Sequence, residues 1–331
     1  MEVNFQPSFV HGLDSNSSFK AQNRACKLRN ISSNIIHHLK GRSELRDALI
    51  CTLMCIVRNR VLRVRDSSPL VIHRCKTYKD MIVVESNREL RELIIQRIRE
   101  QGLNCDLNDI DVSRVTDMSY LFYTLTFEGD ISKWDVSRVK NMTDMFALST
   151  FNGDISKWDV SSVENMNSMF LSSKFDGDIS SWNVSSVKSM NSMFEGSVFN
   201  SDISKWDTSN VRDMSYMFSG SRFNSDISDW NVSRVVNMRC MFSCSEFNKD
   251  ISKWDVSRVK DMESMFYHSM FNGDISAWNV GRVMDMALMF TNSQFSGDLS
   301  GWDASNVESK YCMFVESPLE GREPSWYEIN L

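Results

Sequence analysis

The sequence has few features of a membrane-spanning or generally secreted protein. Residues 1–18 contain neither the basic start nor the apolar stretch of about 7–15 residues that defines a secretory signal peptide. The longest apolar run, Ala48 to Val57, has ten residues, about half of what a helix needs to cross a bilayer. We therefore expect no general secretion and no membrane span, and we interpret this run as a buried helix.

Catalytic motifs are also missing from the sequence. It contains no phosphate-binding loop, no H-E-x-x-H motif and no nucleophile elbow. Of its five histidines, only His268 lies in the repeats described below, at a position that varies. Cys75 and His73 could serve as a thiol and a base, but residues two apart on a strand share a face without pointing at each other. We expect a non-enzymatic protein without a cofactor.

The eight cysteines form no paired framework, which is typical of a chain that works in a reducing compartment such as a cytosol. Cys51 and Cys55, and likewise Cys240 and Cys244, have a spacing that would place two thiols on one helical face. No nearby His or Cys completes a four-ligand site in either case. We expect these thiols to pack and not to bind a metal.

The net charge of −6 conceals two regions of opposite sign. Residues 1–105 carry 18 Lys and Arg against 10 Asp and Glu, a net charge of +8. Subtraction from the totals of 37 and 43 leaves 19 against 33 for residues 106–331, a net charge of −14. These regions could attract each other or outside partners, or simply have different surfaces. Nucleic acid is not an expected partner, because the arginines of the basic region are thinly spread without interleaved aromatic residues.

The strongest signal is a repeat of 24 residues without insertion or deletion. Phenylalanine and Met-Phe pairs recur with the same period as tryptophan. A representative unit extends from Asp130 to Gly153, and residues 106–129 form an earlier copy in which Ile110 replaces tryptophan. The sequence thus holds nine units. Tryptophan occurs at Trp134, Trp158, Trp182, Trp206, Trp230, Trp254, Trp278 and Trp302.

The spacing I-x-x-W-x-V-x-x-V within a unit matches the apolar pattern of a leucine-rich repeat. Alternation over residues 134–136 predicts a short strand. Apolar residues at i, i+3, i+6 and i+7 over 139–146 predict one or two helical turns. Because one unit leaves its apolar face open, only stacking closes it. We predict an α/β solenoid, a leucine-rich-repeat-like stack of nine 24-residue units with a small N-terminal α+β capping region.

The recurring residues are expected to hold this stack together. Methionine at helical spacing and the tryptophan row both predict core packing. Asp130 recurs in every later unit, and stacked carboxylates need compensation, which we expect from turn amides and from the hydroxyl of Ser132. A calcium ladder is the alternative, but the glycine-rich nonapeptide of calcium-binding β-rolls is missing. We expect no bound calcium.

Residues that flank the predicted strand are the candidate binding residues, because solenoids usually bind through a long polar concave surface. Alternation of Asp with Asn at the position of Asp135 indicates an exposed, stacked row. The alternative is that these are ordinary solvated strand residues with no role in binding. The candidates are Lys133, Asp135, Ser137, Lys157, Asp159, Ser161, Asn183, Lys205, Asp207, Asn231, Lys253 and Asp255.

The two ends of the stack need covers. A capping box, Ser86 to Glu89, opens a helical pattern that stops at Gly102 and is expected to seal the first unit. At the other end we expect Trp326 and Tyr327 to plug the last unit. The predicted organisation is therefore as follows: residues 1–20, an unfolded export-signal-like segment; 21–105, a basic α+β region and cap; 106–321, the repeats; 322–331, the C-terminal cap.

The unit F-N-x-D-I-S-x-W-D-V-S-x-V-x-x-M-x-x-M-F, as at 151–170, resembles the BspA-type leucine-rich-repeat surface-protein family. Its members are adhesins or proteins of unknown activity, often exported by a signal peptide or lipid anchor, and the sequence shows neither. The Ser- and Asn-rich start followed by a basic region and these repeats is similar to EspR-like type III secreted effectors of enteric pathogens. That resemblance implies Sec-independent export into a host cytosol and binding of a host protein. The alternatives are an intracellular, cytoplasmic scaffold or a surface adhesin.

Overall fold

The computed structural model describes residues 77–78 and 81–327, which lie in the compact unit formed by His73–Leu331. A second compact unit, Met1–Ile72, lies outside the described residues. The predicted export segment 1–20 and the predicted buried helix from Ala48 to Val57 fall there. So do the thiols Cys51 and Cys55, and the residues His73 and Cys75 lie outside the described residues as well.

Two short strands and a helix precede the repeats. Strands β1 (Thr77–Tyr78) and β2 (Met81–Val83) pair antiparallel, and β2 pairs in parallel with β3 (Ile110–Asp111). Helix α3 (Asn87–Gln101) begins after Ser86, whose side chain accepts a hydrogen bond from the Glu89 amide. It ends at Gly102, where φ is +92°. The predicted helix, its N-cap and its glycine stop are confirmed.

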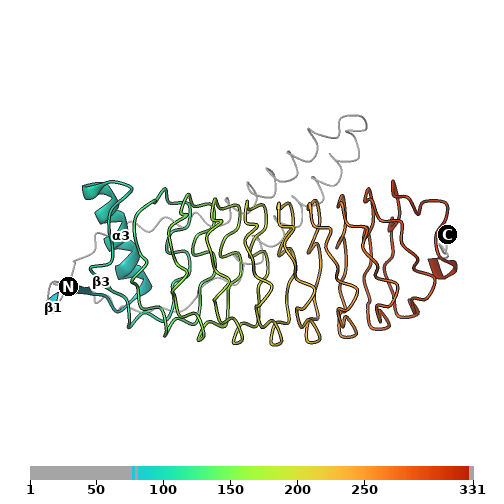
Figure 1. Ribbon diagram of the computed structural model, residues 1–331, viewed down its shortest axis with the longest axis horizontal. Coiled ribbons are helices and arrows are strands. Elements are labelled where there is room, and N and C mark those ends of the chain that lie inside the picture. Colours follow the sequence, from blue (N-terminus) through green and yellow to red (C-terminus); the bar gives the residue numbers. More distant parts are fainter. Residues whose placement is uncertain (1–76, 79–80, 328–331) are drawn as a thin grey trace, which may run out of the picture. The chain divides into compact units, whose positions relative to one another are not determined.

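Helix α3 covers the first repeat with both apolar and polar side chains. Leu90 and Ile94 are fully buried against the core. The side-chain amide of Asn87 donates to the backbone carbonyls of Asp117 and Ser119, at 3.1 and 2.8 Å. Because a unit alone leaves its edge carbonyls unpaired, these contacts satisfy groups that would otherwise cost free energy. The expectation that this helix seals the first unit is confirmed, as Figure 1 shows.

Parallel pairing at intervals of 24 residues joins each unit to the next (Figure 1). The longest run of hydrogen bonds between units covers residues 141–148, where the Met142 amide donates to the Asn165 carbonyl at 2.9 Å and the Phe146 amide to the Met169 carbonyl at 2.9 Å. We call residues 141–148 and their equivalents the paired segment. The strand predicted at 134–136 was therefore wrong, and residues 106–321 form a repeat stack that is paired elsewhere. One bridge joins Asp106 to Asp130, and the bridged residues of the paired segment are Asp117, Asn141, Asn165, Ser189, Asp213, Asn237, Asp261, Asp285 and Ser309.

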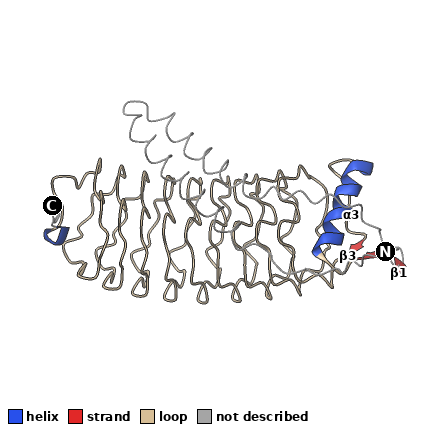
Figure 2. Ribbon diagram, turned by 180° about the vertical axis from the view of Figure 1, so that it is seen from behind, coloured by secondary structure: helices blue, strands red, loops and turns tan. Residues whose placement is uncertain are grey.

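The paired segment is a series of β-turns and not the predicted helical turn (Figure 2). Asp144 and Leu148 have φ of +54° and +57°, and each is the third residue of a turn closed by an i to i+3 hydrogen bond. This pattern is the signature of a type II turn. The helix prediction failed because a turn also places every third residue inside, so the spacing of Met142, Met145 and Phe146 does not distinguish the two.

Aromatic ladders fill the core, as predicted. Phe146 stacks on Phe170 with ring centroids 5.6 Å apart, and Trp134 stacks on Trp158 at 6.4 Å. The Trp158 indole also donates to the Ile131 carbonyl at 3.2 Å, a contact repeated by every later tryptophan of the stack. Each such ring removes roughly 150–250 Å² from water. The indole N–H groups also donate to backbone carbonyls that the turns leave without a hydrogen bond.

The tryptophan ladder continues into the segment predicted as the C-terminal cap. Trp326 lies 24 residues after Trp302, stacks on it at 6.2 Å and donates to the Leu299 carbonyl at 2.8 Å. It belongs to the short 3-10 helix η1 (Ser325–Tyr327). Residues 319–326 thus retain the register of a tenth unit, which the sequence interpretation missed because Pro318 and Pro324 disguise it.

Candidate interaction surface

Each unit bends at short turns in which an Asp or Asn side chain accepts from the backbone two residues on. Asp130 Oδ1 accepts from the Ser132 amide at 2.8 Å. Hydrogen bonds from the Ser132 amide and hydroxyl lower the pKa of Asp130. The same arrangement lowers the pKa of Asp154 and of the later members of this row. The prediction that local donors compensate the stacked carboxylates is confirmed.

The predicted binding residues form rows along the stack, at positions 133, 135 and 137 of each unit. Asp135 accepts from both the amide and the hydroxyl of Ser137, at 3.1 and 2.6 Å. Their role in binding stays a prediction, but their placement beside a paired strand was wrong, because pairing occurs at 141–148. Exposed members are Lys133, Asp135, Lys157, Asp159, Asn183, Lys205, Asp207, Asn231, Lys253 and Asp255; Ser137 and Ser161 are half-buried.

A basic ridge lies next to these rows, at positions 138 and 140 of the units. Residues at position 140 are hydrogen-bonded directly to one another from unit to unit. The Lys260 amide donates to the Val236 carbonyl and the Met284 amide to the Lys260 carbonyl, both at 2.8 Å. Val236 and Met284 are 37% and 42% exposed, which is unusual for apolar residues of this stack. The basic ridge consists of Arg212, Arg234, Val236, Arg258, Lys260, Arg282 and Met284, all exposed.

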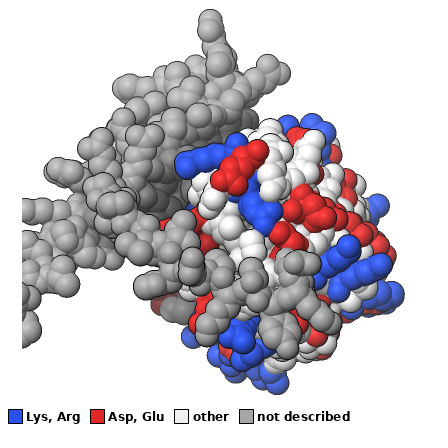
Figure 3. All heavy atoms as spheres, turned by 90° about the vertical axis from the view of Figure 1, so that its left-hand side faces the viewer, with Lys and Arg blue, Asp and Glu red and all other residues white. Residues whose placement is uncertain are grey.

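The composition of the ridge distinguishes it from its surroundings. Figure 3 looks along the stack from the α3 end and shows Lys and Arg interspersed with Asp and Glu over the described surface. In the ridge, basic residues concentrate although residues 106–331 carry a net charge of −14. Arginine and methionine are enriched at protein–protein contacts, because both combine apolar area with adaptable or directional contact.

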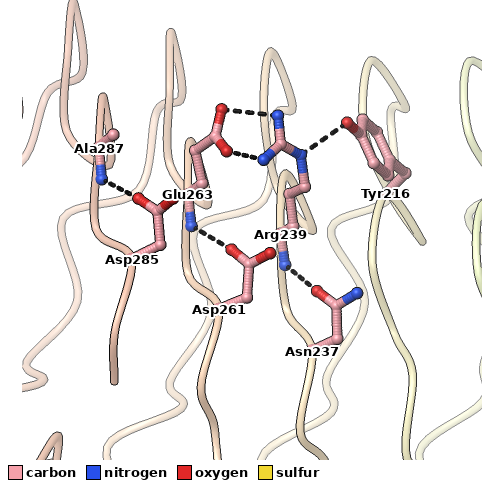
Figure 4. Close-up of polar contacts among 7 residues, drawn as sticks. All are labelled: Tyr216, Asn237, Arg239, Asp261, Glu263, Asp285 and Ala287. Atoms are coloured by element: carbon pink, nitrogen blue, oxygen red, sulfur yellow. Dashed lines mark hydrogen bonds and ion pairs between the residues drawn. The ribbon is translucent and has the colours of Figure 1, made fainter. Parts of the chain in front are cut away.

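One polar cluster ties three units together across the paired segment (Figure 4). Arg239 Nε donates to the Tyr216 hydroxyl at 3.0 Å. Its guanidinium also forms a two-point ion pair with Glu263, one contact being 2.6 Å. The Glu263 side chain is only 19% exposed. Sequence analysis missed this cluster, although opposite charges 24 residues apart at one position would have indicated it.

Asp261 lies beside this cluster and is strained electrostatically. Its Oδ1 accepts from the Glu263 amide at 2.9 Å, as Figure 4 shows. Burial raises the pKa of Asp261, and the neighbouring carboxylates of Asp285 and Asp213 add to the rise, although Arg239 opposes it. Ionisation of Asp261 is therefore less favourable in the folded protein than in the unfolded chain.

The thiols of the described repeats take part in no disulfide. Cys240 and Cys244 were predicted to share a helical face, but both adopt positive φ in turns of the paired segment. Burial raises the pKa of the Cys240 thiol to about 11, so it is protonated at neutral pH and is a poor nucleophile. Cys244 is exposed. At the same position of the next two units, a ring nitrogen of His268 lies 2.7 Å from the side-chain amide nitrogen of Asn292.

The described part of the chain lacks two kinds of feature, a grouped set of metal ligands and a membrane-spanning helix. Within residues 77–78 and 81–327, no three His, Cys, Asp or Glu side chains are grouped so that they could hold a metal ion. None of the helices in the same residues combines the length and apolar character that crossing a bilayer requires.

The fold and this surface define a repeat-stack protein whose units all share one core. Residues 94–198, 173–270 and 243–319 each match the model of a family described as "Mycoplasma protein of unknown function, DUF285". The chain belongs to this family, and the three overlapping matches reflect its repeated unit. No curated protein and no solved structure matches the chain.

Proposed function

We propose that the repeat stack is a non-enzymatic module that binds a protein partner through the surface formed by positions 133–140. The observation that carries this proposal is the basic ridge, where arginines and the exposed side chains of Val236 and Met284 form one continuous strip. Buried positions such as those of Trp134 and Phe146 hardly vary between units, whereas positions 138 and 140 do. Variation confined to the surface favours recognition over packing.

The finer assignments rest on the sequence resemblances. We propose a leucine-rich-repeat-like solenoid similar to the BspA-type family, and a Sec-independent effector that acts in a host cytosol. Cys105, Cys240, Cys244 and Cys312 form no disulfide, which supports a reducing compartment. A secretion assay tests this proposal by comparing the intact chain with one that lacks residues 1–18. Equal export of both chains would contradict the signal assignment.

The binding surface can be tested with three sets of charge reversals in the intact chain. One set changes the ridge, Arg212→Glu and Arg258→Glu. A second changes the predicted row, Asp135→Lys, Asp159→Lys and Asp207→Lys. The control set, Lys174→Glu with Glu246→Lys, alters exposed residues elsewhere and leaves the net charge unchanged. Circular dichroism first establishes that each variant is folded.

The readout is quantitative mass spectrometry of proteins captured from a host lysate. We expect one or more partners that the native chain and the control variant capture equally and the ridge variant loses. If only the second set loses the partner, the partner binds at the row of Asp135, Asp159 and Asp207 and not at the ridge. Equal capture by all chains would contradict binding through positions 133–140.

A further inference from the structure

The basic ridge contains a shallow hollow that is lined by hydrogen-bond donors. Its volume is about 400 Å³, and its lining residues are Ser257, Arg258, Asn279, Gly281 and Arg282. The lining therefore offers two guanidinium groups and a side-chain amide, and none of the five residues is acidic, while the Ser257 hydroxyl already donates to Asp255. Such a set of donors fits an anion.

A single residue change opens this hollow. Gly281 occupies the position at which the eight other units have serine, as in Ser137 and Ser257. A Cβ atom at Gly281 would lie 3.3 Å from Asn279 Oδ1, so any side chain would enter the space. Asn279 Oδ1 already accepts from the Gly281 amide at 3.1 Å, which leaves its Nδ2 group as the donor.

The two arginines carry charge that the described residues balance only in part, through an electrostatic interaction between Arg258 and Asp255. Arg258 and Arg282 hold the same position in consecutive units, so their backbones are roughly 5 Å apart. Neither takes part in the ion pairs found among the described residues. Two adjacent guanidinium groups repel each other, and an anion placed between them would relieve that repulsion.

Two carboxylates lie near the hollow and weaken its positive potential. Asp303 Oδ2 is 3.8 Å from the Cβ position of Gly281. Its other oxygen accepts from the Ser305 amide at 3.1 Å, which fixes the carboxylate in its own turn. Asp255 accepts from the Ser257 amide at 3.1 Å and interacts electrostatically with Arg258. An anion that competes with these carboxylates for the guanidinium groups needs more charge and more acceptor oxygens than they have, so a dianion is favoured over a monoanion such as a carboxylate.

We propose that this hollow binds the phosphate group of a phosphorylated side chain, presented by the protein partner of the stack. A phosphate monoester carries about −1.5 to −2 charges at neutral pH and three strong acceptor oxygens, which match two guanidinium groups and the Asn279 side-chain amide. Met284, two residues after Arg282, offers exposed apolar area to the residues that flank the phosphate. This inference rests on the proposed protein-binding function and names the partner's chemistry.

The test uses the full chain and a short peptide, acetyl-Leu-phosphoserine-Leu-amide, titrated at low salt. Isothermal titration calorimetry gives the affinity, and the amide resonance of Gly281 reports the location. We expect saturable binding, with at least about tenfold weaker affinity for the unphosphorylated peptide. Inorganic phosphate is expected to bind more weakly than the phosphopeptide. Equal affinity for inorganic phosphate would overturn the assignment to a protein-borne phosphate.

Two variants locate the binding in the hollow. Gly281→Ser restores the residue of the other units and fills the space without changing charge, and Arg282→Gln removes one guanidinium. Each is expected to weaken phosphopeptide binding at least about tenfold. Arg222→Gln, which removes an exposed guanidinium outside positions 133–140, is the matched control and should bind as the native chain does. Native affinity in Gly281→Ser would overturn the proposal.

The outcome is separable from that of the proposed function. If the native chain captures a partner and Gly281→Ser captures the same amount, the hollow is not the contact, although the stack still binds protein. If the phosphopeptide binds at Gly281 but no partner is captured, the hollow binds phosphate and the protein-binding function fails.

Discussion

Arg91 of helix α3 donates a hydrogen bond to the Leu121 carbonyl at 2.6 Å, where an amide of a preceding unit would otherwise donate. In the next unit the equivalent carbonyl, that of Met145, accepts from the Phe122 amide at 2.8 Å. Arg91 also contacts the carbonyls of Tyr120 and Tyr123. The helix thus replaces a missing repeat with side-chain donors, and burial lowers the pKa of Arg91 in the process.

Replacing Arg91 with Met should therefore destabilise the stack. The change leaves part-buried carbonyls without donors, and we expect a loss of about 2 kcal/mol in the free energy of unfolding. Urea denaturation followed by tryptophan fluorescence measures it. Arg88→Met is the control, because the Arg88 side chain is 60% exposed and its pair with Glu92 lies on the surface. Equal midpoints for the two variants would contradict the capping role.

The ion pair of Arg239 and Glu263 should contribute more than a surface pair of the same geometry. Arg239→Met leaves a Glu263 carboxylate that is only 19% exposed without its cation, and we expect a loss of about 2 kcal/mol. Lys188→Met breaks a pair with Glu164 that is also 24 residues apart but is 63% and 44% exposed. That control should lose much less stability, because both partners are exposed to solvent. Similar losses, measured as urea midpoints, would show that burial is irrelevant here.

Asp261 should make stability depend on pH in the direction opposite to that expected of Asp130 and its equivalents in the later units. Its folded-state pKa is raised, so ionisation disfavours the folded state, and this penalty is complete above the folded-state pKa. The penalty disappears as pH falls below the unfolded value of about 3.9. Asp261→Asn keeps an acceptor for the Glu263 amide, as Asn237 does for Arg239.

We therefore expect Asp261→Asn to have a higher urea midpoint than the native chain at pH 7, with the difference shrinking toward pH 4. Asp178→Asn is the contrasting variant. Hydrogen bonds from Ser180 lower the pKa of Asp178, so its stabilising contribution is present above the unfolded pKa and is lost as pH falls through the folded one. A lower midpoint for Asp261→Asn at pH 7 would refute the assignment of strain.

Replacing Gly220 with a residue that has a side chain should lower the stability measurably, because Gly220 has a positive φ. Gly220 has φ of +63° in the paired segment, and the nearest atom to a Cβ there lies 3.9 Å away, so Gly220→Ala adds backbone strain without a clash. We expect a loss of about 1 kcal/mol. Gly301→Ala, where nothing lies within 4 Å and φ is not positive, serves as the control and should be close to neutral. Thermal unfolding of both variants provides the comparison.

Much of the fold follows from residues that recur. The 24-residue period of Trp134, Phe146 and Phe151 was enough to predict the stack and its core. A single unit would leave these apolar side chains exposed to water, so equivalent residues of neighbouring units must pack against each other. The bond between Asp130 and Ser132 was also predictable, since both partners lie two residues apart in the chain. Local chemistry and strict periodicity are visible in a single sequence.

Other features were decided only by the stacked units. The spacing of Met142 and Met145 suits a helix as well as a β-turn, and the choice fell to hydrogen bonds between units, which no single unit contains. The same holds for the pair of Arg239 and Glu263, for the donors that Arg91 aims at Leu121, and for the hollow at Gly281. By itself the sequence determined which residues are buried and how often they recur. Tertiary structure decided which backbone atoms pair, because register between units is settled by their packing and not by any one of them.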